Sequence, residues 1–304
     1  MFAALIAGGA SKRVFHVEEK TEMPEKPRRR LQLAWGGSVL RREVLGYLAA
    51  IGLAGGATGE DTIWKDFVAW YRNQPDTVSD LRAAYLEYLK RSGMNEAEAA
   101  ERCQVVDRLA RERREELQPA FFDRTYSTAT PRFNTGPNAL LVETIRDLKP
   151  GRALDVDMGQ GRNAVFLASK GWAVTGFDYS AEGIAAARRA AGKAGVSLDA
   201  SVCRHEDFDF GRARWDLILM TYTWVPLGPP YLQRIIDALK PGGVLVFEGL
   251  MDESGSERPA AWLPKPNQLL EAFGALRILR YEDSWAQADW SWRPERIARL
   301  VARK

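Results

Sequence analysis

The chain has 304 residues, of which 46% are hydrophobic and 27% are charged, so it can fold around one large core or a core with an extension. Its 43 basic and 40 acidic residues leave a net charge of only +3, which argues against a dedicated nucleic-acid binder. The two cysteines are too few for a disulfide framework, and with the two histidines they show no metal-ligand spacing. We therefore expect no nucleic-acid partner and no metal site, and a reduced cytoplasmic environment is the default.

Residues 1–58 are expected to form an irregular leader that contains one possible export signal. Arg41 and Arg42 precede an apolar run, 44–57, that ends in small residues, and this order is typical of a twin-arginine signal. The run is too short for a stable membrane span, which needs about 20 apolar residues. A cytoplasmic protein is therefore the main prediction, and export or membrane anchoring through this segment is the alternative.

Residues 59–120 are predicted to form a helical extension. Apolar residues at helical spacing, followed by a proline, mark its first helix. Its third helix begins at a capping-box pattern of Asn95 and Glu98 and is expected to end at Pro119. The extension could shape a substrate entrance or mediate dimerisation, so that an oligomer is possible.

From residue 136 onward the pattern changes to alternating strands and helices. Apolar strands are expected over 152–158, 173–180, 197–207, 215–224 and 244–250. Such alternation predicts a parallel sheet that is covered by helices on both faces. The tail differs, because 275–286 and 296–304 resemble a closing strand pair. The predicted fold is therefore α/β, a doubly wound, Rossmann-like, seven-stranded and mostly parallel sheet.

The glycine-rich loop after the first predicted strand is the candidate ligand site. In a doubly wound sheet, ligands bind beyond the carboxyl ends of the strands. Residues 159–164 match the pattern G-x-G-x-x-A of dinucleotide sites. Asp178 follows about 20 residues further on, where an acid can accept hydrogen bonds from ribose hydroxyls. Asp178 could instead cap the next helix, although Ser180 is better placed for that role.

The stretches ALDVDMGQGRNAVFLA, GFDYS, HEDF and LKPGG together resemble class I S-adenosylmethionine-dependent methyltransferases. The chain most resembles the small-molecule branch that carries a G-x-G-R-N-A loop, which includes the tellurite-resistance type. This resemblance implies a methyltransferase domain over 121–304, S-adenosylmethionine as the cofactor, and in-line methyl transfer to a small-molecule acceptor. A dinucleotide-dependent oxidoreductase is the less favoured alternative, because an acid lies within the first strand.

The resemblance also implies a role for each polar position around the loop. Asp155 would organise the loop near the methionine part of the cofactor, and Asp178 would bind the ribose hydroxyls. After the third strand, Glu206 or Asp207 would bind the adenine amino group, with Phe208 against the ring. The other residues expected to contact the cofactor are Asp157, Gly159, Gly161, Arg162, Tyr179 and Thr221. The alternatives are structural: a hydrogen-bonding role for Asp155, and for Arg162 only the opening of a helix.

Asp157 departs from the family pattern, because it stands in the place of the first of three loop glycines. Aspartate is among the few residues that tolerate a positive φ, so the turn can persist. Its charge could pair with the ammonium of the cofactor or repel the carboxylate. We expect weakened but not abolished binding, and a non-catalytic protein that retains the fold is the alternative function.

Tyr222 and Trp224, after the fourth predicted strand, are the substrate-side candidates. A dry aromatic pocket suits a sulfonium that loses its charge in the reaction, although core packing explains these residues equally well. No catalytic residue is assigned. Tyr126 and Phe133 precede the core where this family often folds a segment over the cofactor. Three tryptophans of a predicted hairpin loop could form a lid, an oligomer contact or plain packing: Trp285, Trp290 and Trp292.

Overall fold

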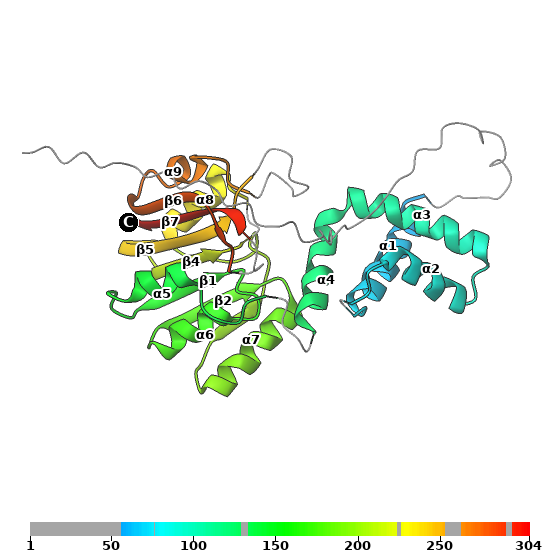
Figure 1. Cartoon of the computed structure of the whole chain (residues 1–304), viewed down its shortest axis with the longest axis horizontal. Helices are drawn as coiled ribbons and strands as arrows, with labels where there is room; N and C mark the ends of the chain where they lie inside the picture. The colour runs from blue at the N-terminus through cyan, green and yellow to red at the C-terminus, as the bar shows by residue number, and fades with distance from the viewer. Residues whose placement is uncertain (1–55, 76, 129–132, 224–225, 253–262, 290–293) are drawn as a thin grey trace, which may run out of the picture. The chain divides into compact units, whose positions relative to one another are not determined.

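The structure is a computed structural model that describes residues 56–75, 77–128, 133–223, 226–252, 263–289 and 294–304 (Figure 1). Arg41 and Arg42 of the predicted leader lie outside these residues, as do Trp224, Trp290 and Trp292. Within the described residues, no helix combines the length and the apolar character that crossing a membrane requires.

In the described part of the chain, four helices precede the sheet: α1 (Gly56–Arg72), α2 (Leu81–Arg91), α3 (Glu96–Glu112) and α4 (Arg114–Tyr126). Asn95 and Glu98 form the expected capping box at the start of α3, since each side chain accepts a hydrogen bond from the other residue's backbone amide. Buried aromatic residues hold the helices together, among them Trp64, Phe67 and Tyr85. The predicted N-terminal helices are therefore confirmed.

One helix boundary in this region differs from the prediction. α3 ends at Glu112, the backbone turns at Arg113 with φ −114° and ψ 34°, and Pro119 lies inside α4. Pro119 is the sixth residue of α4, so the helix continues through it without the amide that would donate to the carbonyl of Glu115. The expectation that Pro119 closes the third helix is wrong.

Seven strands of the described residues form one sheet in the order β3-β2-β1-β4-β5-β7-β6. They are β1 (Arg152–Val156), β2 (Ala173–Asp178), β3 (Asp199–Val202), β4 (Trp215–Thr221), β5 (Leu239–Leu250), β6 (Arg277–Gln287) and β7 (Pro294–Arg303). The strands from β3 to β5 pair in parallel, whereas β7 pairs antiparallel with both β5 and β6. The seven-stranded, mostly parallel sheet and its closing hairpin are confirmed.

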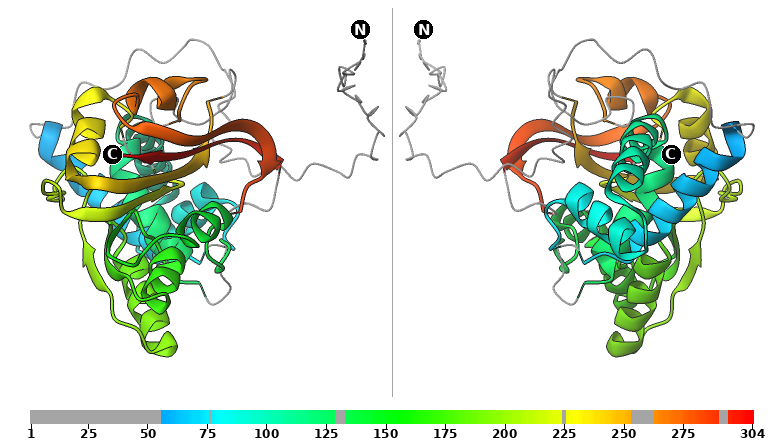
Figure 2. Two further views of the ribbon diagram at one scale, coloured as in Figure 1. Left: turned by 90° about the vertical axis from the view of Figure 1, so that its left-hand side faces the viewer. Right: turned by 90° about the vertical axis from the view of Figure 1, so that its right-hand side faces the viewer.

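Helices cover both faces of this sheet (Figure 2). One face packs against α5 (Ala139–Ile145), α6 (Arg162–Ser169) and α7 (Ala181–Ala194), and the other against α8 (Pro229–Ala238) and α9 (Gln268–Ala272). In β1, Ala153 packs on the first face, while Leu154 and Val156 pack on the second. A strand that is buried on both faces is normally apolar throughout, so Asp155 within β1 calls for a specific role.

The order of the strands reverses between β1 and β4, which are neighbours in the sheet. The crevice beyond the carboxyl ends of two such strands is where open α/β sheets bind ligands. Asp157 follows β1 and Tyr222 follows β4, so residues from both loops meet at this position.

Asp123 on α4 joins the helical extension to α7. Its Oδ1 atom accepts hydrogen bonds from the hydroxyl of Ser180, at 2.6 Å, and from the backbone amide of Glu182, at 3.2 Å. The other carboxylate oxygen, Oδ2, lies 3.0 Å from Nε of Arg72. Because Asp123 is buried, these contacts fix α4 beside the start of α7, and the aromatic side chains of α4 reach the glycine-rich loop.

Candidate cofactor and acceptor site

The loop between β1 and α6 turns through three residues in the left-handed region. Asp157, Gly159 and Gly161 have φ angles of 51°, 52° and 78°. Aspartate reaches this region more readily than most other residues with a side chain. The substitution of the first loop glycine therefore keeps the turn and adds a carboxylate to it.

The two loop glycines each make room for a different protein neighbour. A Cβ atom on Gly159 would collide with the hydroxyl of Tyr126 on α4, and one on Gly161 would lie 2.6 Å from Cβ of Ala187 on α7. The ring of Tyr126 also lies against Gly183, where a Cβ atom would be 3.0 Å from Cδ2. Protein neighbours thus explain both glycines, and contact with a cofactor stays a prediction for them.

Asp178, at the end of β2, is buried and holds the loop in place. Its Oδ2 atom accepts a hydrogen bond from the amide of Gly159 at 2.8 Å, and its Oδ1 atom accepts one from the amide of Ser180 at 2.8 Å. Burial raises the pKa of Asp178 above its ordinary value, while these two amides act in the opposite direction. Ser180 itself caps α7 by accepting from the amide of Gly183 at 3.0 Å.

Asp155 is a buried acid, and the residue is only 1% exposed. Its Oδ2 atom has no hydrogen-bond partner among the described residues. Burial raises the pKa of this group to about 7, although the charge of Arg162 and the amide of Ala164 lower it. A buried carboxylate oxygen without a donor is costly, so this atom marks a place where a ligand donor can bind.

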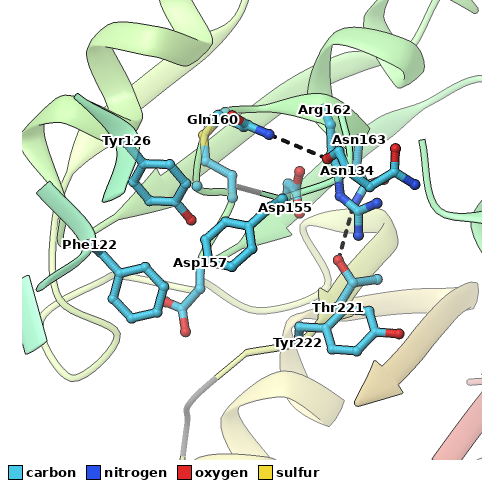
Figure 3. A pocket seen from close by; sticks show the side chains of 13 residues that line it. Phe122, Tyr126, Asn134, Asp155, Asp157, Gln160, Arg162, Asn163, Thr221 and Tyr222 are labelled. Carbon is cyan, nitrogen blue, oxygen red and sulfur yellow. Dashed lines mark hydrogen bonds between the residues drawn. The ribbon is translucent and has the colours of Figure 1, made fainter. Parts of the chain in front are cut away.

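A cavity opens beside the loop, and Figure 3 shows it from close by. The carboxylates of Asp155 and Asp157 lie between Phe122 and Tyr126 of α4 on one side and Tyr222 on the other. Of the residues expected at the site, the structure places six in the cavity wall: Asp155, Asp157, Gly159, Arg162, Thr221 and Tyr222. It brings together the residues that follow β1 and β4.

Aromatic side chains cover the cavity. The ring of Phe122 lies 5.8 Å from that of Tyr126, 6.4 Å from that of Phe133 and 5.6 Å from that of Tyr179, measured between centroids. Tyr126 and Phe133 line the cavity directly, in agreement with their expected position over the site. Trp285 is instead 60% exposed in β6, which does not agree with plain packing for this tryptophan.

Arg162 and Asn163 do more than open α6. Two nitrogens of Arg162 donate to the two carboxylate oxygens of Asp289, each at 2.9 Å, and the same guanidinium donates to the carbonyl of Gly136 at 3.1 Å. Asn163 donates to Oγ1 of Thr221 at 2.9 Å. Both side chains therefore link the glycine-rich loop to other parts of the cavity wall.

A buried polar network lies next to the cavity and involves residues that the sequence patterns do not single out. Glu248 in β5 is 1% exposed. It accepts hydrogen bonds from Asn138 Nδ2 at 2.8 Å, from the hydroxyl of Tyr222 at 2.8 Å and from Arg299 Nε at 2.7 Å. The signal was present in the sequence, because Glu248 is the one charged residue in the apolar stretch VLVFEGL.

Tyr222 is the substrate-side candidate that the structure describes, and its backbone is strained. Its φ of 55° is rare for an aromatic residue. Its hydroxyl donates to Glu248 and accepts from the amide of Asp289 at 3.2 Å. Burial, reinforced by the charge of Glu248, raises the pKa of the Tyr222 phenol far above its ordinary value. Tyr222 is therefore a protonated, positioned hydrogen-bond donor at neutral pH.

The residues predicted for the adenine end are placed differently. Glu206 and Asp207 are exposed, and the ring of Phe208 stacks on that of Phe177 at a centroid distance of 4.1 Å. Neither these three residues nor Asp178 and Tyr179 line the described cavity. The choice between Glu206 and Asp207 thus stays open, and Phe208 already has an aromatic partner within the protein.

His205 and Tyr231 form a buried pair near these residues, with ring centroids 5.3 Å apart. The hydroxyl of Tyr231 and Nε2 of His205 have no hydrogen-bond partner among the described residues. His205 Nε2 lies 3.2 Å from Oε1 of Glu206 without the geometry of a hydrogen bond. Burial lowers the pKa of His205, so the ring is neutral at pH 7 and does not form an ion pair there.

The fold and the loop can be compared with the class of protein that the sequence resembles. The strand order, the antiparallel β7 between β5 and β6, and the glycine-rich loop at the reversal between β1 and β4 are the features that a resemblance to class I methyltransferases implies. The resemblance in the sequence predicted this class, and the structure agrees with it.

Comparison with known proteins leads to the same family, since residues 153–243 match the family described as a methyltransferase domain. The chain is 25% identical to hemagglutinin 1 of Eikenella corrodens over 162 residues, which are 49% of this chain and 52% of that protein. It is 34% identical to the ubiquinone biosynthesis O-methyltransferase of Paramagnetospirillum magneticum over 122 residues, or 37% and 49% of the two chains. The chain thus spans about half the length of the curated relatives that it matches.

Among solved structures, TehB from Haemophilus influenzae shares the fold. The match has a TM-score of 0.50 at 19% identity and covers 61% of this chain and 66% of TehB. The chain therefore shares the fold of TehB, and its residues 153–243 are similar to a methyltransferase domain.

Proposed function

We propose that this domain binds S-adenosylmethionine and transfers its methyl group to a small-molecule acceptor by in-line displacement. One observation carries the proposal. Buried polar atoms that lack a hydrogen-bond partner among the described residues occur near the carboxyl ends of three strands, β1, β3 and β4, and on α8: Asp155 Oδ2, His205 Nε2, Thr223 Oγ1 and Tyr231 Oη. A ligand with several donors and acceptors is the usual partner for such a group of atoms.

The residues present suit the polar parts of this cofactor. Asp155 would receive a donor from its methionine end, and Asp178 would receive the ribose hydroxyls, because a carboxylate oxygen that accepts one amide has a further lone pair. When bound, S-adenosylmethionine supplies a methyl group that is activated by a sulfonium. The contribution of the protein is to bind, align and exclude water.

Aromatic walls serve the acceptor side of the proposed reaction. Phe122, Tyr126, Phe133 and Tyr222 line the cavity, so an acceptor that enters it leaves bulk water. Tyr222 keeps its proton and has its hydroxyl fixed by Glu248, which makes it a positioning residue for the acceptor side. The catalytic role stays unassigned.

A second candidate is a non-catalytic protein that keeps the fold, and one observation favours it. The ring of Tyr126 lies directly on Gly159 and Gly183. The cavity measures about 70 Å³, whereas pockets for drug-sized ligands measure about 300–1,000 Å³. Under the first proposal, binding of the cofactor must therefore move Tyr126 and its aromatic neighbours away from the loop.

Calorimetry separates these proposals. Under the first, S-adenosylmethionine and S-adenosylhomocysteine bind and NAD does not. A matched variant, Tyr126→Ala, should tighten the binding of both, because it removes the ring that lies on Gly159. Absence of binding in both proteins, or binding of NAD alone, would refute the first proposal. Release of S-adenosylhomocysteine in the presence of small thiols, amines, phenols or chalcogen oxyanions then identifies the acceptor.

A further inference from the structure

Acidic residues outnumber basic ones among the described residues of the cavity wall. Asp155 and Asp157 both line it, and Arg162 is the only basic residue among the described residues that do so. In a site shielded from water, acidic side chains favour a cation and disfavour a further anion. Whether the guanidinium of Arg162 is paired within the protein or available to a ligand therefore decides which ligand charge the cavity favours.

Arg162 is already paired. Its guanidinium makes a two-pronged contact with Asp289, in which each carboxylate oxygen accepts at 2.9 Å. The two side chains are only 11% and 18% exposed, and Asn138 Nδ2 donates to Asp289 Oδ2 at 3.0 Å. Two parallel N–H···O bonds are the usual way in which arginine binds a carboxylate. Asp289 thus occupies the place on Arg162 that a carboxylate of a ligand would need.

Asp155 provides a second, independent observation. Its side chain is almost completely buried, it lines the cavity, and its Oδ2 atom lacks a donor among the described residues. An ammonium group carries three donors and a positive charge, so it can satisfy this atom. The rings of Phe122, Tyr126, Phe133 and Tyr222 in the same wall also favour an organic cation.

We infer that this cavity selects an organic ammonium group that has no carboxylate beside it. This inference rests on the proposed function, because it concerns the same site and names the chemistry of its ligand. Two ligands offer this chemistry. One is an amine that serves as the methyl acceptor, and the other is a cofactor form without the carboxylate, decarboxylated S-adenosylmethionine.

Titration calorimetry of the full chain with matched probes tests the inference. S-adenosylmethionine and its decarboxylated form differ only in the carboxylate, and phenethylamine and 3-phenylpropionate exchange an ammonium for a carboxylate on the same skeleton. The second pair is titrated with and without S-adenosylhomocysteine. In at least one pair, we expect the ligand without a carboxylate to bind at least about tenfold more tightly than the ligand with one. A tenfold difference in affinity corresponds to about 1.4 kcal/mol.

The variant Asp289→Asn removes the charge that neutralises Arg162 but keeps the shape of the side chain. In each pair, it should change the ratio of the two affinities by about fivefold or more in favour of the ligand that has a carboxylate. Asp283→Asn is the matched control, because Asp283 lies on the same hairpin and pairs with Arg296 but does not line the cavity. It should leave both ratios unchanged. Asp157→Asn provides a second test, because it should weaken the binding of the two ligands that lack a carboxylate. Thermal unfolding of each variant is recorded as a control for stability.

The outcomes are distinct. A preference for the decarboxylated cofactor assigns the ammonium to the cofactor, and binding of phenethylamine only with S-adenosylhomocysteine assigns it to the acceptor. The inference is wrong, while the proposed function stands, if S-adenosylmethionine binds but neither decarboxylated S-adenosylmethionine nor phenethylamine binds more tightly than its partner with a carboxylate. The same holds if Asp289→Asn changes neither affinity ratio. If neither the two cofactor forms nor S-adenosylhomocysteine bind, both fail.

Discussion

At the carboxyl ends of β1, β4 and β5, the edge of the sheet is buried and densely hydrogen-bonded, whereas the loop after β3 carries two exposed acids beside the buried His205. In the first region, Glu248 accepts from three side chains and Arg162 holds Asp289 in a two-pronged pair. In the second, Glu206 and Asp207 are exposed. A rigid polar frame suits the end where the proposed methyl transfer would require alignment of the reactants. We therefore expect substitutions in the two regions to have very different effects.

Glu248→Ala should have the largest effect on stability. It removes a buried acceptor from Asn138, Tyr222 and Arg299, and loss of one partner of a buried ion pair costs about 3–5 kcal/mol. Chemical denaturation measures the change. Glu282→Ala is the control, because Glu282 also contacts Arg299 but is 34% exposed, and pairs near the surface contribute about 0–1 kcal/mol. Equal effects of the two substitutions would contradict the proposed difference between the regions.

The pH dependence of stability should depend on Asp155. Burial raises its pKa to about 7 in the folded protein, above the value of about 3.9 in unfolded chains. Because the folded state then binds the proton more tightly, the free energy of unfolding should fall as pH rises from about 4 to about 7. Relative to Asp155→Asn, the wild type should lose about 2 kcal/mol between pH 5 and pH 7, at about 1.4 kcal/mol for each pH unit. Parallel curves for the two proteins would show that Asp155 is not the cause.

Gly159→Ala should destabilise the protein by a smaller amount. The φ of 52° costs alanine about 1–2 kcal/mol, and the new Cβ atom meets the hydroxyl of Tyr126. Gly192→Ala on α7 is the matched control, since no atom lies near its Cβ position and alanine gains about 0.5–1 kcal/mol in a helix. Thermal unfolding should therefore give opposite signs for the two substitutions. Removal of the hydroxyl by Tyr126→Phe should reduce the cost of Gly159→Ala.

The sequence predicts the parts of this molecule that depend on local patterns. The cap at Ser180, the capping box at Asn95, the parallel strands and the turn through Asp157 all follow from neighbouring residues. The network around Glu248 does not. Asn138 bonds to residues that lie 110 and 151 positions away, and no periodic pattern connects them. The acids within apolar strands, Asp155 and Glu248, were visible in the sequence, but their partners come only from the tertiary fold.

Asp157 belongs to the locally predicted turn and also lines the cavity beside Arg162, whose partner Asp289 is distant in the sequence. Replacement of Asp157 should give the smallest of the expected effects. Asp157→Gly restores the glycine of the family pattern and removes one negative charge from a cavity whose only described base is paired with Asp289. The carboxylate of S-adenosylmethionine then meets less repulsion, so its affinity should rise by about three- to tenfold, or at most about 1.4 kcal/mol. Calorimetry measures this change.

Asp157→Asn separates the two possible causes, because it removes the charge and keeps the side chain. If charge dominates, asparagine and glycine should tighten binding equally, and added salt should diminish the difference from wild type. If the side chain merely fills space, only glycine should help. An affinity for S-adenosylmethionine that is unchanged or weaker in Asp157→Gly would mean that Asp157 pairs with the cofactor rather than opposing it. The carboxylate would then belong to the binding site itself, and the departure from the family pattern would be an adaptation of the loop to its ligand.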